Sequence, residues 1–265
     1  MCHHRVPFRA VRTRCSVPLV IALWLGYIVV WIGTAAVLQP DGADFEDAFD
    51  DLDNSRYLVY GLIAGVIYGS VVATVFGWWR DVFADDRTTV APVTGWHRFV
   101  PAIALVLILA TNDYPGLSDL DTELLAWIIA AGVLVGISEE LMFRGNTIVA
   151  LRGVPVPEST VWLLSSILFA LIHVPNFVLG APPAAAIVNA VVAFFGGTLF
   201  YVVRRASGSI LVAMLTHGLW DFTLFAAEEE AYANIRTPVY LILVILIIVT
   251  RRRLFPTTGD GATST

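Results

Sequence analysis

Residues 121–143 read DTELLAWIIAAGVLVGISEELMF, and this stretch decides the fold class of the chain. It is almost wholly apolar after Glu123 and is long enough to cross a bilayer as a helix, which takes about 20 residues. Near its end stand two adjacent glutamates, Glu139 and Glu140. A charge in hydrocarbon is so costly that ionisable residues inside such a helix indicate a functional site.

The composition of the whole chain is that of a polytopic membrane protein. Of its 265 residues, 57% are hydrophobic and only 14% are charged, and the mean hydropathy is +0.76. A soluble domain would carry about a quarter charged residues. The two cysteines, Cys2 and Cys15, precede the first apolar run and show no metal-type spacing, so neither a metal motif nor a disulfide framework is expected.

Apolar runs recur along the chain, and we predict an all-α transmembrane bundle of about eight helices. The runs cover residues 17–38, 57–79, 98–111, 123–143, 160–179, 184–203, 209–226 and 237–250. The third run is short enough to lie at the membrane interface instead of crossing. Three parts follow from this pattern: a basic arm over residues 1–16, a membrane domain over 17–250 and a disordered tail over 251–265.

The arginines predict the orientation of the bundle. When the connections are numbered alternately from an inner N-terminus, every arginine except Arg56 and Arg236 falls on or near the inner side. The outer connections are acidic and supply most of the net charge of −6, which therefore does not indicate a nucleic-acid partner. We predict a multi-pass protein of the cytoplasmic membrane, in contact with the lipid bilayer, with both its arm and its tail in the cytoplasm.

Few ionisable residues remain inside the predicted helices. Of 22 acidic residues, only Glu139, Glu140 and Asp221 lie in apolar segments, and of five histidines only His173 and His217 do. His217 and Asp221 are four residues apart and so share one helix face. Because all five residues fall in just three helices, the sequence predicts one shared site.

The spacing around the paired glutamates predicts their surroundings. Glu140 and Arg144 are four residues apart and can form an ion pair, whereas Glu139 points about 100° away from Glu140. The apolar pattern continues past Arg144, so we expect the helix to extend to about Arg152, with a kink at Gly145 as an option. That extension places Glu139 about 20 Å from the helix end, deep in the membrane.

Together these residues resemble the CPBP family of intramembrane endopeptidases, which includes the type II CAAX prenyl proteases and the bacteriocin-processing and immunity proteins. The resemblance covers about residues 120–225 and rests on three motifs. They are E-E-x-x-x-R at 139–144, F-x-x-x-H from Phe169 to His173, and H-x-x-x-N/D from His217 to Asp221. It implies that these residues form a peptidase site, with Phe169 as a wall of the substrate pocket.

The resemblance also implies a role for each candidate catalytic residue. Glu139 would act as general base on a water molecule that His173 helps to hold. Glu140 would orient the site through Arg144. His217 and the residue at 221 would stabilise the oxyanion of the tetrahedral intermediate.

Asp221 stands where the prenyl proteases have asparagine, and an ionised carboxylate cannot donate a hydrogen bond to an oxyanion. It could be protonated, it could orient His217, or it could bind a metal. Glu139, His173, His217 and Asp221 could together hold Zn²⁺, although the chain has no H-E-x-x-H motif. A glutamate mechanism and a metalloprotease mechanism therefore both stay open.

We predict an intramembrane endopeptidase that opens toward the cytoplasm and hydrolyses hydrophobic or lipidated peptides at the membrane. Two alternatives stay open: a non-catalytic immunity or scaffold protein of the same fold, and a proton-coupled transporter that uses the buried Glu, His and Asp residues. Asn176 and Asn189 are interpreted as residues that form hydrogen bonds between helices. The sequence leaves open the oligomeric state and whether the substrate is prenylated.

Overall fold

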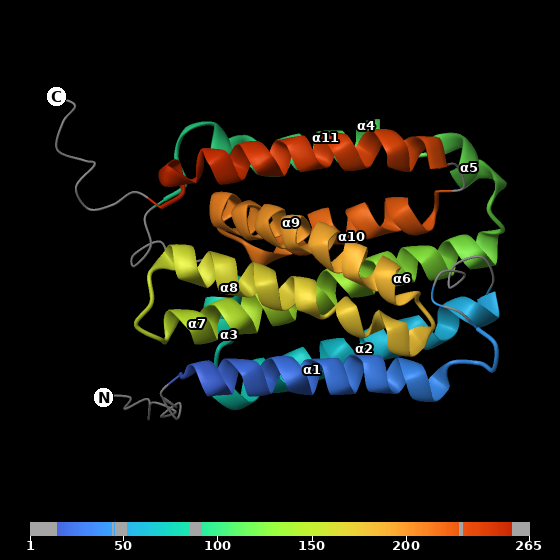
Figure 1. The fold of residues 1–265 in the computed structure, drawn as a ribbon, viewed down its shortest axis with the longest axis horizontal. Helices are drawn as coiled ribbons and strands as arrows, with labels where there is room; N and C mark the ends of the chain where they lie inside the picture. Colours follow the sequence, from blue (N-terminus) through green and yellow to red (C-terminus); the bar gives the residue numbers. More distant parts are fainter. Residues whose placement is uncertain (1–14, 44, 46–51, 85–91, 228–229, 256–265) are drawn as a thin grey trace, which may run out of the picture.

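The computed structural model describes residues 15–43, 45, 52–84, 92–227 and 230–255. Within these ranges the chain is helical and has no β-strand; an isolated bridge pairs Ala84 with Ser209. The long helices lie alongside one another in a bundle (Figure 1). Apolar side chains from most of these helices form one large buried core.

Each of the eight predicted apolar runs falls on helical structure. The longer elements are α1 (Val17–Leu38), α2 (Leu52–Phe76), α4 (Val100–Ala110), α6 (Thr122–Glu140), α8 (Glu158–Leu171), α9 (Pro183–Ser207), α10 (Ile210–Phe225) and α11 (Glu230–Val249). The short elements are α3 (Trp79–Phe83), η1 (Gly95–Phe99), α5 (Tyr114–Asp119), η2 (Leu141–Thr147), α7 (Ile148–Arg152), η3 (Val174–Leu179) and η4 (Arg251–Arg253).

Five helical segments of the described chain are long and apolar enough to cross a membrane: Val17–Leu38, Ser55–Phe76, Thr122–Arg152, Glu158–Leu179 and Pro183–Ser207. Many of their outward-facing side chains are large and apolar, as a lipid environment requires. The chain is therefore an integral membrane protein. Three shorter apolar helices accompany the five, and the full set of eight crossings stays a prediction.

The helix that carries the paired glutamates continues to Arg152, as the apolar pattern predicted. Its middle segment, Leu141–Thr147, is π-helical, and all seven of its residues are buried. Within it, Nδ2 of Asn146 donates a hydrogen bond to the carbonyl oxygen of Gly69 at 2.9 Å. Such π segments insert an extra residue into a helix and are common at functional sites.

The predicted single helix over 160–179 is divided in the structure. The α-helix α8 ends at Leu171, and the chain continues as the 3₁₀ helix η3 from Val174. Pro175 accounts for the change, because it has no N–H to donate and its ring clashes with the carbonyl one turn earlier. His173 therefore lies at the junction of two helical forms.

Helices α6 and α10 pack at very short range because glycines line their contact. A Cβ atom added to Gly136 would collide with the carbonyl oxygen of Met214, and one added to Gly218 would lie 2.7 Å from the carbonyl oxygen of Gly132. Small residues of this kind let the backbones of membrane helices approach closely. This approach brings the glutamates of α6 next to His217 of α10.

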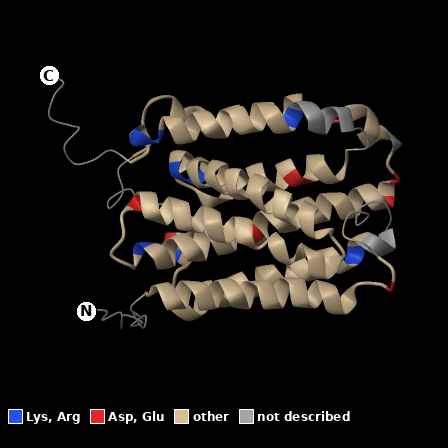
Figure 2. Cartoon of the chain, viewed as in Figure 1, with Lys and Arg blue, Asp and Glu red and all other residues tan. Residues whose placement is uncertain are grey.

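The two ends of the bundle differ in charge. We call proximal the end at which α1 begins and α11 ends, and distal the end at which α1 and α10 end (Figure 1). Arg152 ends α7, and Arg204 and Arg205 lie in the last turn of α9. Figure 2 shows most of the arginines gathered at the proximal end. This distribution favours a cytoplasmic proximal end, which stays a prediction.

Candidate active site

Glu140 is the centre of a buried charged cluster. Its Oε1 atom lies 2.9 Å from Nη1 of Arg144 and 2.8 Å from Nδ1 of His217 on α10. The side chains of all three residues are at most 4% exposed. A buried ion pair is tolerated when further hydrogen bonds satisfy its charges, and the ring N–H of His217 supplies one here. The pair predicted from helical spacing is thus present and is joined by His217.

Glu139 lies beside this cluster without joining it. Its Oε2 atom is 3.9 Å from Nε2 of His217, and its side chain is only 5% exposed. Among the described residues, this buried oxygen has no hydrogen-bond partner. Such a carboxylate oxygen has lone pairs free to accept a hydrogen bond from a water or a substrate.

His173 and Phe169 are fixed to each other at the end of α8. Nδ1 of His173 lies 3.1 Å from the carbonyl oxygen of Phe169, which orients the imidazole ring. The Phe169 ring packs edge-on against both histidines, with centroid distances of 5.2 Å to His173 and 5.6 Å to His217. Phe169 thus positions two imidazole rings at once.

Phe200 on α9 is a site residue that the sequence analysis missed. Its ring stacks on that of His217, with centroids 4.2 Å apart and planes inclined by 22°. Phe169 and Phe200 also cover Arg144, at 4.0 Å and 5.3 Å from its Cζ atom. Cation–π contacts of this kind stabilise a guanidinium that water cannot reach. No motif marks Phe200, because only the packing of α9 against α10 brings it here.

Asp221 lies one turn after His217 on α10, and its Oδ2 atom is 3.3 Å from Nε2 of that histidine. Its side chain is 16% exposed, against 5% for Glu139. Nε2 of His217 therefore faces Asp221, while Nδ1 faces Glu140. This arrangement can hold the imidazole ring in one orientation.

A cavity of about 160 Å³ joins the acidic and imidazole groups. We call it the inner cavity, and Glu139, His173 and Asp221 all line it, together with Asn176 and Asn189. A water occupies about 30 Å³ in the liquid, so the inner cavity has room for several waters. Three ionisable groups from three parts of the chain thus share one small cavity, whose other lining residues are mostly apolar.

A second, larger cavity of about 420 Å³ shares part of its wall with the inner cavity, and we call it the outer cavity. Ala181, which precedes α9, and Ala227, which follows α10, line the outer cavity. Both positions lie at the distal end of the bundle (Figure 1). The sequence analysis expected an opening toward the cytoplasm. The outer cavity lies toward the distal end, and which side of the membrane that end faces stays a prediction.

The zinc ligand set proposed from the sequence does not assemble. Within the described ranges, no group of three or more His, Cys, Asp and Glu side chains is arranged to hold a metal ion. The described residues therefore give no support for a zinc centre at Glu139, His173, His217 and Asp221. The choice between a glutamate and a metal-dependent mechanism stays open.

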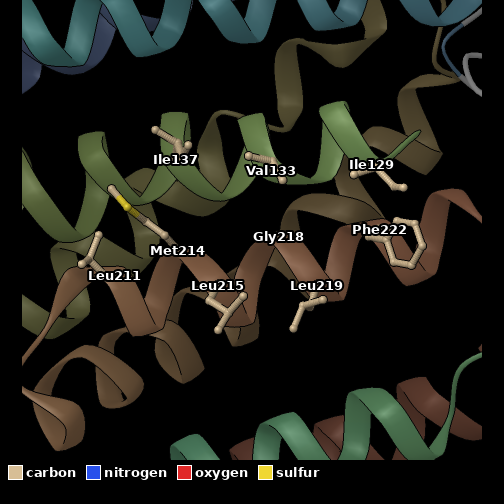
Figure 3. Close-up of a pocket in the computed structure, with 9 residues that line it drawn as sticks. All are labelled: Ile129, Val133, Ile137, Leu211, Met214, Leu215, Gly218, Leu219 and Phe222. Atoms are coloured by element: carbon tan, nitrogen blue, oxygen red, sulfur yellow. The ribbon is translucent and has the colours of Figure 1, made fainter. Parts of the chain in front are cut away.

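A further hollow of about 370 Å³ lies on the outside of the α6–α10 pair, between side chains such as Val133 and Leu215 (Figure 3). All nine residues that line it are apolar or glycine, and none of them lines the inner cavity. Val133 and Leu215 are 54% and 58% exposed, so this groove faces the lipid. It has no group that could take part in acid–base chemistry.

The part of the chain that holds the three motifs is similar to a known family. Residues 121–223 match the family model described as type II CAAX prenyl endopeptidase Rce1-like. This segment of the chain is Rce1-like. The Rce1-like segment contains every candidate site residue, from Glu139 to Asp221, which confirms the resemblance expected from the motifs. The family is one of membrane proteases.

Helices outside the Rce1-like segment also build the site. Trp31 of α1 and Leu58 and Leu62 of α2 line the inner cavity. Ser138, which precedes Glu139 in the chain, lies within hydrogen-bonding distance of Tyr27 on α1, with 2.8 Å between the two hydroxyl oxygens.

No curated protein matches the sequence at a significant level.

Asn176 and Asn189 were interpreted from the sequence as residues that form hydrogen bonds between helices. In the structure both line the inner and outer cavities. Oδ1 of Asn176 is buried and has no hydrogen-bond partner among the described residues. The three-residue spacing from His173 to Asn176 was the one available signal that Asn176 belongs to the site.

Proposed function

We propose that the protein is an intramembrane endopeptidase that hydrolyses peptide bonds of membrane-associated or lipidated peptides. One observation carries the proposal: within an Rce1-like segment, Glu139, His173 and Asp221 line a single cavity. Peptide hydrolysis needs a base for water and a polar environment for the developing oxyanion. The inner cavity offers a carboxylate that can act as the base and polar side chains that can surround the oxyanion.

In the proposed reaction, Glu139 takes a proton from a water held in the inner cavity with the help of His173. The water oxygen forms a bond to the carbonyl carbon of the substrate, and the carbonyl oxygen becomes an oxyanion. Collapse of this intermediate breaks the C–N bond, and the proton held by Glu139 passes to the leaving amine. His217 donates the N–H of Nε2 to the oxyanion once the substrate is bound, in place of its contact with Asp221; such a donor is typically worth about 3–4 kcal/mol of activation free energy.

Glu140 and Arg144 are positioning residues in this scheme. Glu140 holds His217 through Nδ1 and is itself held by Arg144. Asp221 orients the other side of the same ring. The lack of a metal-ligand arrangement among the described residues favours the glutamate mechanism in the proposal.

The proposal includes a topology of eight crossings with both termini in the cytoplasm. The arginine-rich proximal end and the three shorter apolar helices support it. The protein would then be a multi-pass protein of the cytoplasmic membrane. Its oligomeric state is open.

The test is mass spectrometry of membrane peptides from cells that carry the native protein or Glu139→Ala. We expect a set of peptide termini that the native protein produces and Glu139→Ala does not. Glu123→Ala is a matched control, because Glu123 lies on the same helix but is exposed in its first turn. If the peptide termini were identical in the native and the Glu139→Ala cells, the peptidase proposal would be wrong.

The two alternative functions make different predictions for the same variants. A scaffold or immunity protein would keep its cellular function in Glu139→Gln. A proton-coupled transporter would carry protons along a gradient in proteoliposomes, and Glu139→Gln would stop that flux. Neither result is expected for a peptidase.

A further inference from the structure

The inner and outer cavities adjoin each other, and the inner one is lined by Glu139. Six residues line both: Phe45, Leu58, Asn176, Asn189, Leu224 and Phe225. The inner cavity adds the ionisable groups of the site, and the outer cavity adds Ala181, Ala185, Ala186 and Ala227. We call the combined path the channel.

The outer part of the channel lies toward the distal end of the bundle. It is lined by residues next to the start of α9 and the end of α10, which lie distally (Figure 1). On the proximal side of Glu139 the chain continues into the π-helical segment Leu141–Thr147, where every residue is buried. Met142 and Phe143 are fully buried there, and Arg144 is 1% exposed. The part of the chain that follows Glu139 on the proximal side is therefore packed into the core.

Two asparagines supply the polar groups of the channel wall between its mouth and the ionisable residues. Asn176 is only 2% exposed, and its Oδ1 atom has no hydrogen-bond partner among the described residues. A buried amide in this condition costs free energy that a bound ligand would recover. Asn189 reaches the same wall from α9.

The side chains of the channel wall favour an uncharged ligand that has both hydrogen-bond donors and hydrogen-bond acceptors. An asparagine amide donates through its nitrogen and accepts through its oxygen, which matches the C=O and N–H groups of a peptide backbone. The outer cavity has no ionisable residue among its described lining. Ala181, Ala185 and Ala186 leave space beside the asparagines for an extended chain.

We propose that Asn176 and Asn189 bind the backbone of an extended, uncharged peptide segment, which reaches Glu139 through the channel from the distal end. The identity of the ligand rests on the proposed peptidase function. The side from which the ligand enters the channel does not depend on that function. With a cytoplasmic proximal end, the substrate segment comes from the opposite side of the membrane. Substrates would then be peptides exposed on the extracytoplasmic face.

Single-cysteine labelling tests the direction of access. In the full chain with Cys2→Ser and Cys15→Ser, one cysteine is placed as Asn189→Cys, Arg251→Cys or Val191→Cys. Arg251 is exposed at the proximal end, and Val191 is 56% exposed on the lipid side of α9. Right-side-out and inverted membrane vesicles are treated with a small charged methanethiosulfonate. The reagent cannot cross lipid.

We expect Asn189→Cys and Arg251→Cys to react from opposite sides and Val191→Cys to react from neither. Reaction of Asn189→Cys from the same side as Arg251→Cys would overturn the inference. So would a lack of reaction from either side while Arg251→Cys is labelled. This result needs no peptidase activity, so it is independent of the proposed function.

Asn176→Leu and Asn189→Leu test the binding of the peptide backbone. We expect each to lower the amount of native-specific peptide termini at least about tenfold, with an unchanged melting temperature. Val191→Leu is the control and keeps the native amount. Native amounts in the double asparagine variant, with none in Glu139→Ala, would overturn the backbone site while the peptidase proposal stands. No change in Glu139→Ala itself would overturn the peptidase proposal, and the bound peptide with it.

Discussion

Nδ1 of His217 lies 2.8 Å from Oε1 of Glu140, although the two residues are 77 positions apart in the chain. The same carboxylate oxygen lies 2.9 Å from Nη1 of Arg144. One glutamate thus links two helices and neutralises a buried guanidinium. Its neighbour Glu139 stays free of such bonds and faces the inner cavity. The two adjacent glutamates therefore have different expected roles, which mutation can separate.

Glu139→Gln is expected to lower the rate of peptide cleavage by about 10²–10⁴-fold, because an amide cannot accept the proton of water. The melting temperature should change little, since Oε2 of Glu139 is 3.9 Å from His217 and has no hydrogen-bond partner among the described residues. Cleavage is measured by the native-specific peptide termini and stability by thermal unfolding in detergent. Cleavage at the native level would show that Glu139 is not the base.

Arg144→Met is expected to destabilise the protein by about 3–5 kcal/mol, because it leaves Glu140 buried without its charged partner. Thermal or denaturant unfolding in detergent measures the loss. Arg251→Met is the control, since an exposed arginine should change stability by no more than about 0.5 kcal/mol.

The double variant Glu140→Gln with Arg144→Met removes both charges of the pair. We expect it to recover most of the stability lost in Arg144→Met and yet to stay inactive, because His217 loses its charged acceptor. Recovery of activity along with stability would mean that the pair only holds the helices together.

Asp221→Asn and Asp221→Ala distinguish two roles of Asp221. If Asp221 orients His217, the asparagine oxygen can accept the same hydrogen bond, and cleavage should stay within about tenfold of native. Asp221→Ala has no acceptor and should lose about 10²-fold or more. Equal, large losses in both variants would indicate that the negative charge itself is required. Cleavage is measured with the same peptide termini.

Gly136→Ala is expected to destabilise the protein by about 1–3 kcal/mol, because the added methyl group would collide with the Met214 backbone. The helices α6 and α10 must move apart, so the contact between Glu140 and His217 should weaken and cleavage should fall. Gly33→Ala is a matched control, since a Cβ there has no atom within 4 Å. An active, fully stable Gly136→Ala would contradict the close helix contact.

Prolonged dialysis against EDTA is expected to leave cleavage unchanged, because the proposed mechanism uses no metal. The measurement compares peptide termini before and after dialysis of the purified protein in detergent. Loss of activity that Zn²⁺ restores would contradict the glutamate mechanism and require the side chains of Glu139, His173, His217 and Asp221 to rearrange.

Periodicity within single helices explains the predictions that the structure confirms. The ranges of the apolar runs matched helices, and the four-residue spacings of Glu140 with Arg144 and of His217 with Asp221 correspond to observed contacts. These relations lie within single helices, where 3.6 residues per turn sets which side chains meet. Pro175 was visible in the sequence, but its effect on the end of α8 was not predicted.

The sequence by itself determined that this is a helical membrane protein, and it identified the ionisable residues that lie within apolar helices. It also carried the ordered motifs that match the Rce1-like family. The tertiary structure decided that Phe200 covers His217 and Arg144, that Glu140 rather than Glu139 holds His217, and that the cavities lead to the distal end. Distances between helices depend on how side chains and glycines pack across their contacts, and no periodicity within one helix encodes them.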